Sequence, residues 1–275
     1  MGPRFGLIAG SGELPLLALE EAAARGWVSV VAGVRGEASR DLEQKAGAFL
    51  WFDPGRPEEA VRFLKDRGVE SVLLAGKVDP RASFRRPEGW PGRGERPAGT
   101  PEGTPSALIL AFIRYLESRG LRVMDPAPFL SPHFCAEGVL TAVQPPGPVL
   151  EDAHFGWALA KRMADLDVGQ TVIVKTRTVA AVEAAEGTDA AIRRAAALAG
   201  PGTVAVKVGR TRQDLRIDVP GVGLSTIRTL IEAEAAALCL EAGRVAFFQR
   251  QEALDLADKA GLAVFARKGT GKENG

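Results

Sequence analysis

One short segment near the end of the chain has residue types that could hold a divalent cation and a phosphate together. It reads Gln213-Asp-Leu-Arg-Ile-Asp-Val-Pro220. Its polar and apolar residues alternate, which predicts a strand over Leu215–Val219 with Asp214, Arg216 and Asp218 on one face. Carboxylates are hard ligands for a divalent cation, and a guanidinium forms a fork that matches phosphate. The other interpretation is an ordinary amphipathic strand with a solvated, salt-bridged face.

A second segment, Val182-Glu-Ala-Ala-Glu-Gly-Thr-Asp189, leads from a predicted strand into a predicted helix. Gly187 permits a tight turn, Thr188 or Asp189 can cap the helix, and the amides at such a helix start attract phosphate. Asp189 or Glu186 could instead hold a metal ion. A capped helix start without any ligand explains the pattern equally well.

Two turns after predicted strands form the third candidate. Gly10, Ser11 and Gly12 follow the first strand, with the opening spacing of a dinucleotide fingerprint. Pro15 stands where the third glycine would fall, which argues against a nicotinamide site. Lys77 follows the third strand, and open parallel sheets bind ligands at the carboxyl ends of their strands. Gly10–Gly12 could therefore cradle a mononucleotide or phosphate, and Lys77 is a candidate phosphate contact, for which a solvated lysine after a turn is the competing interpretation. Together with the amides of Gly187 and Thr188, these residues are expected to hold nucleotide or phosphate.

The elements that must position these residues fall into two halves. Residues 1–143 alternate short apolar strands with amphipathic helices, which predicts an N-terminal domain with a parallel sheet covered on both faces. Residues 144–275 follow a proline-rich joint and mix helices with a hairpin at Thr176-Arg177, which predicts a mixed α+β catalytic domain. The chain is thus expected to be an α/β protein of two domains.

A loop rich in proline and glycine interrupts the first half at Arg85–Pro105. Ten of its twenty-one residues are Pro or Gly, which rules out regular structure. The hypothesis is a lid in which Trp90 reaches toward acyl chains and the arginines toward phosphate or a membrane surface. A surface insertion without a role is the alternative.

Composition excludes several classes of protein. The chain has 275 residues, with 35 Lys and Arg against 34 Asp and Glu, so its charge gives no reason to expect nucleic acid as a partner. It has no run of 18 apolar residues, and we expect a cytoplasmic protein without a signal peptide. Cys135 and Cys239 are far apart and lack metal-ligand neighbours, so both are predicted to be reduced and buried. The sequence leaves a homodimer open.

Several segments together resemble a known family, the UDP-2,3-diacylglucosamine pyrophosphatases of the LpxI type, over nearly the whole chain. Besides the three candidates above, the resemblance rests on these segments: Gly6–Pro15, Ala75–Val78, Ala136–Thr141, Asp167–Gln170 and Glu241–Gly243. It implies hydrolysis of a lipid-linked nucleotide sugar to UMP and a diacylglucosamine 1-phosphate, with Mg²⁺ or Mn²⁺. It also implies that Asp218 is the essential aspartate and that Asp214 is an acidic partner.

The implied mechanism is metal-assisted attack of water on the α-phosphate. Asp218 would be a metal ligand or the base, Asp214 a second metal contact, and Arg216 would neutralise phosphoryl charge. One departure matters, because the family's Gly-Asp-Asp-x-Leu-Leu segment is replaced by Gly103–Ile109, which lacks both acids. This departure motivates one alternative, a nucleotide- and lipid-binding protein without catalysis. The Gly-Ser-Gly turn motivates another, a nicotinamide-dependent oxidoreductase.

Overall fold

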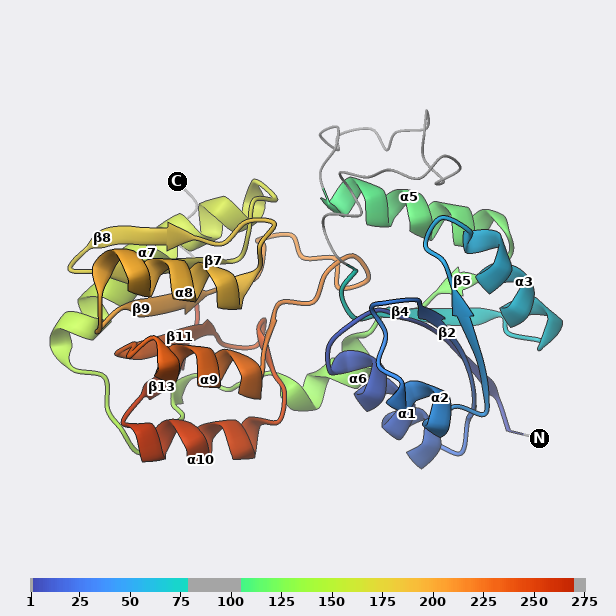
Figure 1. Ribbon diagram of the computed structural model, residues 1–275, viewed down its shortest axis with the longest axis horizontal. Helices are drawn as coiled ribbons and strands as arrows, with labels where there is room; N and C mark the ends of the chain where they lie inside the picture. The colour runs from blue at the N-terminus through green and yellow to red at the C-terminus, as the bar shows by residue number, and fades with distance from the viewer. Residues whose placement is uncertain (1, 79–104, 270–275) are drawn as a thin grey trace. The chain divides into compact units, whose positions relative to one another are not determined.

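The computed structural model describes residues 2–78 and 105–269, and the chain folds into two compact units (Figure 1). The first unit comprises Met1–Phe129 together with Asp214–Asp218, and the second comprises Leu130–Gln213 and Val219–Gly275. Residues 85–104, which make up almost all of the predicted lid, lie outside the described residues, so the lid hypothesis stays a prediction.

The first unit is built on a five-stranded parallel sheet. Its strands are β1 (Arg4–Ala9), β2 (Val28–Val34), β3 (Ala48–Phe52), β4 (Ser71–Ala75) and β5 (Arg122–Val123), in the order β3-β2-β1-β4-β5. The predicted parallel sheet is confirmed. The sequence prediction missed β3, a run of five apolar residues, although Gly47 precedes it and the turn residues Asp53-Pro54-Gly55 follow it.

Helices cover both faces of this sheet, as the continuous apolar strands require. They are α1 (Leu14–Ala24), α2 (Asp41–Lys45), α3 (Pro57–Asp66), α5 (Pro105–Ser118) and α6 (Ala127–Leu130). Helices α3 and α5 lie on one face, and α1 lies on the other (Figure 1). The core between the sheet and α3 and α5 contains Ile8 of β1, Leu64 of α3 and Leu116 of α5, all buried.

The strand order places a topological switch next to β1. From β1 the chain builds β2 and β3 on one side, and then crosses to build β4 and β5 on the other. The segments that follow β1 and β4 therefore begin side by side at the carboxyl edge of the sheet. Open α/β sheets bind their ligands at such a point.

The second unit has a six-stranded mixed sheet, in the order β6-β13-β11-β9-β7-β8. Its strands are β6 (Gly138–Val139), β7 (Thr171–Lys175), β8 (Thr178–Val182), β9 (Val204–Lys207), β11 (Ala237–Glu241) and β13 (Ala263–Arg267). Strands β9, β11 and β13 run parallel, whereas β6 and the β7–β8 hairpin pair antiparallel. A separate short pair joins β10 (Gly221–Val222) to β12 (Ala246–Phe247). The mixed sheet of the C-terminal half is confirmed.

The predicted hairpin turn at Thr176-Arg177 is also confirmed. Both residues have positive φ, 49° and 55°, as a two-residue turn that matches the twist of the strands requires. The carboxylate of Asp152 accepts hydrogen bonds from both turn amides, at 2.8 Å from Thr176 and 2.5 Å from Arg177. Asp152 thereby offsets the strain of two non-glycine residues in the left-handed region.

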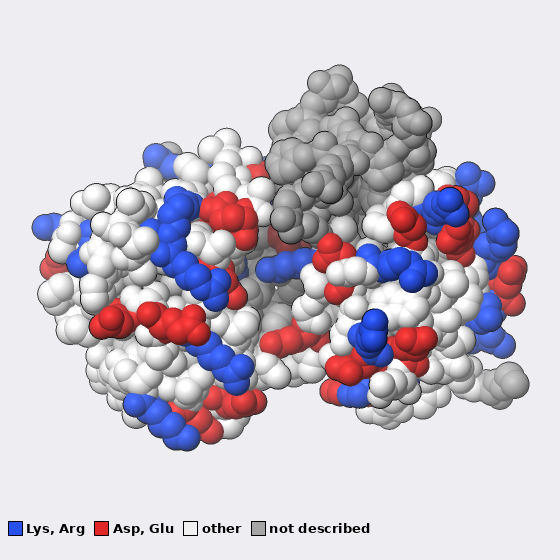
Figure 2. All heavy atoms as spheres, in the orientation of Figure 1, with Lys and Arg blue, Asp and Glu red and all other residues white. Residues whose placement is uncertain are grey.

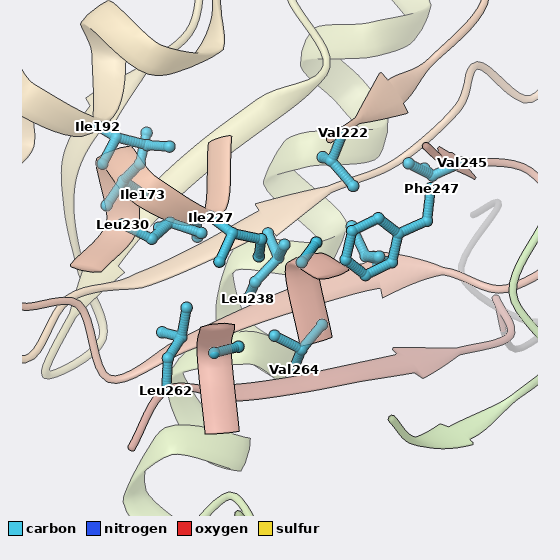
Figure 3. Close-up of a cluster of buried hydrophobic side chains, with 14 of the residues drawn as sticks. Ile173, Ile192, Val222, Ile227, Leu230, Leu238, Val245, Phe247, Leu262 and Val264 are labelled. Carbon is cyan, nitrogen blue, oxygen red and sulfur yellow. The ribbon is translucent and has the colours of Figure 1, made fainter. Parts of the chain in front are cut away.

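Helices enclose a core on each face of the second sheet. Helix α7 (Gly147–Asp165) packs on one face, and α8 (Thr188–Ala199), α9 (Leu224–Glu232) and α10 (Arg250–Ala260) pack on the other. Figure 3 shows the second core, in which Ile227 of α9 meets Leu238 of β11. Among the residues described, no helix has the length and apolar character needed to cross a bilayer.

Both cysteines are buried and unbridged, as predicted. Cys239 lies on β11, and burial raises the pKa of its thiol to about 12. Because the thiolate is the reactive form, we expect native Cys239 to resist iodoacetamide at pH 8 and to react once the chain is unfolded in guanidinium. Peptide mass spectrometry of samples alkylated with and without denaturant checks this, and rapid native labelling of Cys239 would contradict its placement in the core.

Candidate active site

Two of the segments predicted to bind phosphate, Gly10–Gly12 and Lys77, lie together in the first unit at the carboxyl ends of β1 and β4, and we call them the phosphate cradle. Ser11 and Lys77 form an isolated bridge: the Ser11 amide donates to the Lys77 carbonyl at 2.7 Å, and the Lys77 amide donates to the Ser11 carbonyl at 2.8 Å. The Ser11 hydroxyl adds a bond of 2.9 Å to the Lys77 carbonyl. The two turns at the switch point are thus joined, and Lys77 is brought beside Gly10–Gly12 with an exposed side chain.

Close backbone approach explains the glycines in these two turns. A Cβ atom on Gly10 would lie 2.2 Å from the Lys77 carbonyl oxygen. Gly76 has φ +90°, and a Cβ there would lie 2.5 Å from the Ser11 carbonyl oxygen. Sequence reasoning singled out Lys77 but not Gly76, although a glycine directly before Lys77 at a strand end was the available signal.

The segment Gln213–Pro220 is not the predicted strand, and this prediction was wrong. Residues 215–217 form a turn, in which the amides of Ile217 and Asp218 donate to the Asp214 carbonyl at 3.1 and 3.4 Å. The physical reason is local: the Asp214 side chain accepts the Arg216 amide at 3.0 Å, an aspartate-capped turn that competes with a β ladder. We call residues Asp214–Asp218 the acidic turn.

Asp214 and Arg216 bind each other rather than standing apart on a strand face. Oδ1 of Asp214 accepts from Arg216 Nε at 3.0 Å, and Oδ2 accepts from Nη2 at 2.7 Å. The hydrogen bond from Arg216 lowers the pKa of the Asp214 carboxyl. Since the folded pKa lies below the unfolded one, the contribution of the charged pair to stability is present above the usual aspartate pKa and is lost as the pH falls through the lowered value. Both side chains are about one-third exposed, so solvent screening keeps that contribution small.

The acidic turn belongs to the first unit, although its neighbours in sequence belong to the second. Ile217 packs against the core formed by the first sheet with α3 and α5. The negative charges of Glu117 and Asp125, both in the first unit, help to raise the pKa of Arg216, after the larger effect of its hydrogen bond to Asp214. Asp218 is therefore carried by the same unit as the phosphate cradle.

The third candidate, Val182–Asp189, starts helix α8 in the second unit. Gly187, with φ +84°, is the N-cap, and no side chain caps the helix, so the predicted cap at Thr188 or Asp189 was wrong. The Thr188 hydroxyl instead turns inward, donating to Glu183 at 2.7 Å and accepting from Lys207 Nζ at 2.8 Å. The Asp189 carboxylate accepts from the Thr226 hydroxyl of α9 at 2.9 Å.

Thr188 therefore belongs to a buried polar cluster, which we call the Lys207 network. Lys207 is 3% exposed, and its ammonium also donates to Thr171 at 3.1 Å and pairs with Glu183 at 3.3 Å. Such a buried charge is stable only when it is paired and hydrogen-bonded. The buried contacts of Glu183 and Thr188 give the segment a structural role. The predicted role of Gly187 and Thr188 in phosphate binding stays a prediction.

A divalent metal site is not preformed among the described residues, which hold no group of three or more His, Cys, Asp or Glu side chains suited to a metal ion. Asp214 is committed to Arg216, and Asp189 is in the second unit. Magnesium commonly needs only one or two protein carboxylates, because substrate phosphates and waters supply its remaining ligands. Asp218 fits that smaller donor set, and Asp214 fits it less well.

The fold defines a two-unit α/β protein with a candidate phosphate site at a sheet switch point, and family models match both halves of the chain. The LpxI N-terminal domain matches residues 4–133, and the LpxI C-terminal domain matches residues 136–265. The chain belongs to the LpxI family.

The chain is also similar to a relative with a named enzymatic activity. The chain is 29% identical over 275 residues to the UDP-2,3-diacylglucosamine pyrophosphatase LpxI of Caulobacter vibrioides, covering 95% of this chain and 96% of that protein. Among solved structures, it is similar to the holo form of a GalE-like L-threonine dehydrogenase from Cupriavidus necator. There the identity is 10%, the TM-score is 0.35, and the match covers 97% of this chain and 86% of the other. That TM-score is below the value expected of a shared fold.

Proposed function

We propose that this protein is a hydrolase that cleaves the pyrophosphate of UDP-2,3-diacylglucosamine, or of a closely related nucleotide-sugar lipid, to release UMP and a sugar-lipid 1-phosphate. Membership of the LpxI family, over both of its domains, is the observation that carries this proposal. The activity of the Caulobacter vibrioides relative names the substrate. The geometry supports the reaction class, since the phosphate cradle and Asp218 belong to one unit.

Phosphoryl transfer depends mainly on positioning and on stabilisation of charge. In the proposed mechanism, Gly10–Gly12 and Lys77 bind the pyrophosphate, and Asp218 orients the water that attacks the α-phosphorus. Arg216 neutralises charge on the phosphoryl oxygens, because a guanidinium has five N–H donors and Asp214 engages only part of them. A Mg²⁺ or Mn²⁺ ion held by Asp218 and the substrate would further neutralise the pyrophosphate. The bond from the α-phosphorus to the bridging oxygen breaks, and the sugar-lipid phosphate leaves with that oxygen. The attacking water gives up a proton to Asp218, which returns it to solvent, and UMP leaves.

The test is turnover by the purified full chain. UDP-2,3-diacylglucosamine in detergent micelles, with Mg²⁺ or Mn²⁺, should yield UMP in a chromatographic assay, and chelation of the metal should stop it. Omitting the acyl chains, as in UDP-N-acetylglucosamine, should reduce the rate. Tight binding of the lipid without release of UMP would instead favour a non-catalytic binding protein, the alternative that the missing acid pair at Gly103–Ile109 motivates. Contact with a membrane surface and a homodimer stay predictions.

Replacing Lys77 with methionine should weaken UMP binding about tenfold or more, because a charge-assisted hydrogen bond contributes about 1.5–3 kcal/mol. Lys77 is exposed, so the substitution should leave stability unchanged. Isothermal titration with UMP checks this, with Lys65→Met, on helix α3 of the same unit, as the control. Equal affinities for the two variants would remove Lys77 from the cradle.

A further inference from the structure

A segment of five residues, the acidic turn, belongs to one unit while the chain on both sides belongs to the other. Gln213 and Val219 lie in the second unit, and Asp214–Asp218 lie in the first. The turn contains no regular secondary structure and forms no strand of the first sheet. Something other than a β ladder must therefore hold it on the first unit.

The inside of the turn is fixed by Asp214. Its carbonyl accepts the amides of Ile217 and Asp218, and its carboxylate accepts the amide and the guanidinium of Arg216. These four kinds of contact inside the turn all end on Asp214. With its two carboxylate oxygens used in this way, Asp214 is poorly placed to act as a base or as a metal ligand.

The outside of the turn is fixed by Ile217. Its half-buried side chain packs against the core of the first unit, which is formed by β-strand residues together with α3 and α5. This contact joins the turn to the core of the first unit. The acids Glu117 and Asp125 add an electrostatic attraction to Arg216 beside it.

We propose that Asp214 and Ile217 are positioning residues: Asp214 sets the shape of the acidic turn, and Ile217 anchors it to the first unit, so that Asp218 is presented to the reacting phosphate. This inference rests on the proposed function for its catalytic consequence but not for the structure of the turn. It reassigns Asp214 from a direct role in metal binding to a role exerted through its neighbours.

The structural half of the inference is tested without any substrate. Ile217→Ala and Asp214→Ala should each speed amide hydrogen exchange at Ile217 and Asp218 at least tenfold relative to the wild-type full chain. Leu50→Ala is the matched control, because Leu50 is a half-buried residue of the same core outside the turn. It should lower stability to a similar extent and leave those two amides protected. Unchanged exchange in Ile217→Ala would overturn the anchor.

The catalytic half is tested by kinetics with the nucleotide-sugar lipid. Ile217→Ala should lower kcat about tenfold or more while KM and UMP affinity stay within about twofold, since the phosphate cradle is untouched. Ile217→Val should restore most of the rate, and Leu50→Ala should keep it. Faster exchange with an unchanged kcat would overturn the positioning role.

Failure of the proposed function and failure of the positioning role can be distinguished. If wild-type protein lacks turnover, the proposed function fails, while the exchange data still decide whether Ile217 and Asp214 hold the turn. Suppose instead that the wild type turns over, and that Ile217→Ala and Leu50→Ala change kcat and KM to the same extent. The effect is then general destabilisation, and the inference is wrong.

Discussion

Replacing Asp218 with alanine is expected to lower kcat by on the order of 10³-fold or more while the protein stays folded. Asp218 is half-buried in a turn rather than in a core, so its loss should cost little stability. The loss of the group that orients the attacking water typically removes several orders of magnitude of rate. UMP release measured at saturating substrate, together with thermal unfolding, checks both halves of the expectation.

Asp66→Ala provides the control for this variant. Asp66 is an exposed aspartate at the end of α3 in the same unit, and its replacement should leave kcat unchanged. If Asp218→Ala retained the wild-type rate, the attack would have to be supported by another group, and the family's aspartate would have been assigned to the wrong position.

The second large effect concerns stability. Lys207→Met is expected to lower the free energy of unfolding of the second unit by about 3–5 kcal/mol, because Glu183 is left charged and buried without its cationic partner. The loss should be visible as a lower urea midpoint followed by circular dichroism. Lys259→Met, on the exposed face of α10, is the control and should be neutral.

A second substitution separates the lost charge from lost packing. In the double variant Lys207→Met with Glu183→Gln, no buried charge remains in the Lys207 network, so part of the stability should return. A double variant no more stable than Lys207→Met would show that the ammonium acts through packing rather than through its pairing with Glu183.

Sequence patterns predicted the sheets because apolar strands and turns leave local signatures. The continuous apolar residues of β1, β2 and β4 indicated strands buried on both faces, and the two residues between β7 and β8 indicated a hairpin. Gly10–Gly12 and Lys77 were each predicted as phosphate contacts because each follows a strand of a parallel sheet, and the strand order of the structure joins them.

The acidic turn could not be predicted from its period of two alone. Alternation of polar and apolar residues is shared by a strand and by this turn, and the choice was made by the side chain of Asp214 and by the core contact of Ile217. The inward direction of Thr188 was hidden for a similar reason. Its partner Lys207 is distant in sequence, and a lysine in β9 reads as a surface residue until the fold buries it.

The central claim is that water attacks the α-phosphorus with the help of Asp218. The most direct test is to run the reaction in water enriched in ¹⁸O and to measure the masses of both products by mass spectrometry. The proposed attack on the α-phosphorus puts one ¹⁸O atom into UMP and none into the sugar-lipid phosphate, with the label absent when Asp218→Ala is used. Label in the sugar-lipid phosphate, or no UMP from wild-type protein with metal and lipid substrate both present, would contradict the account.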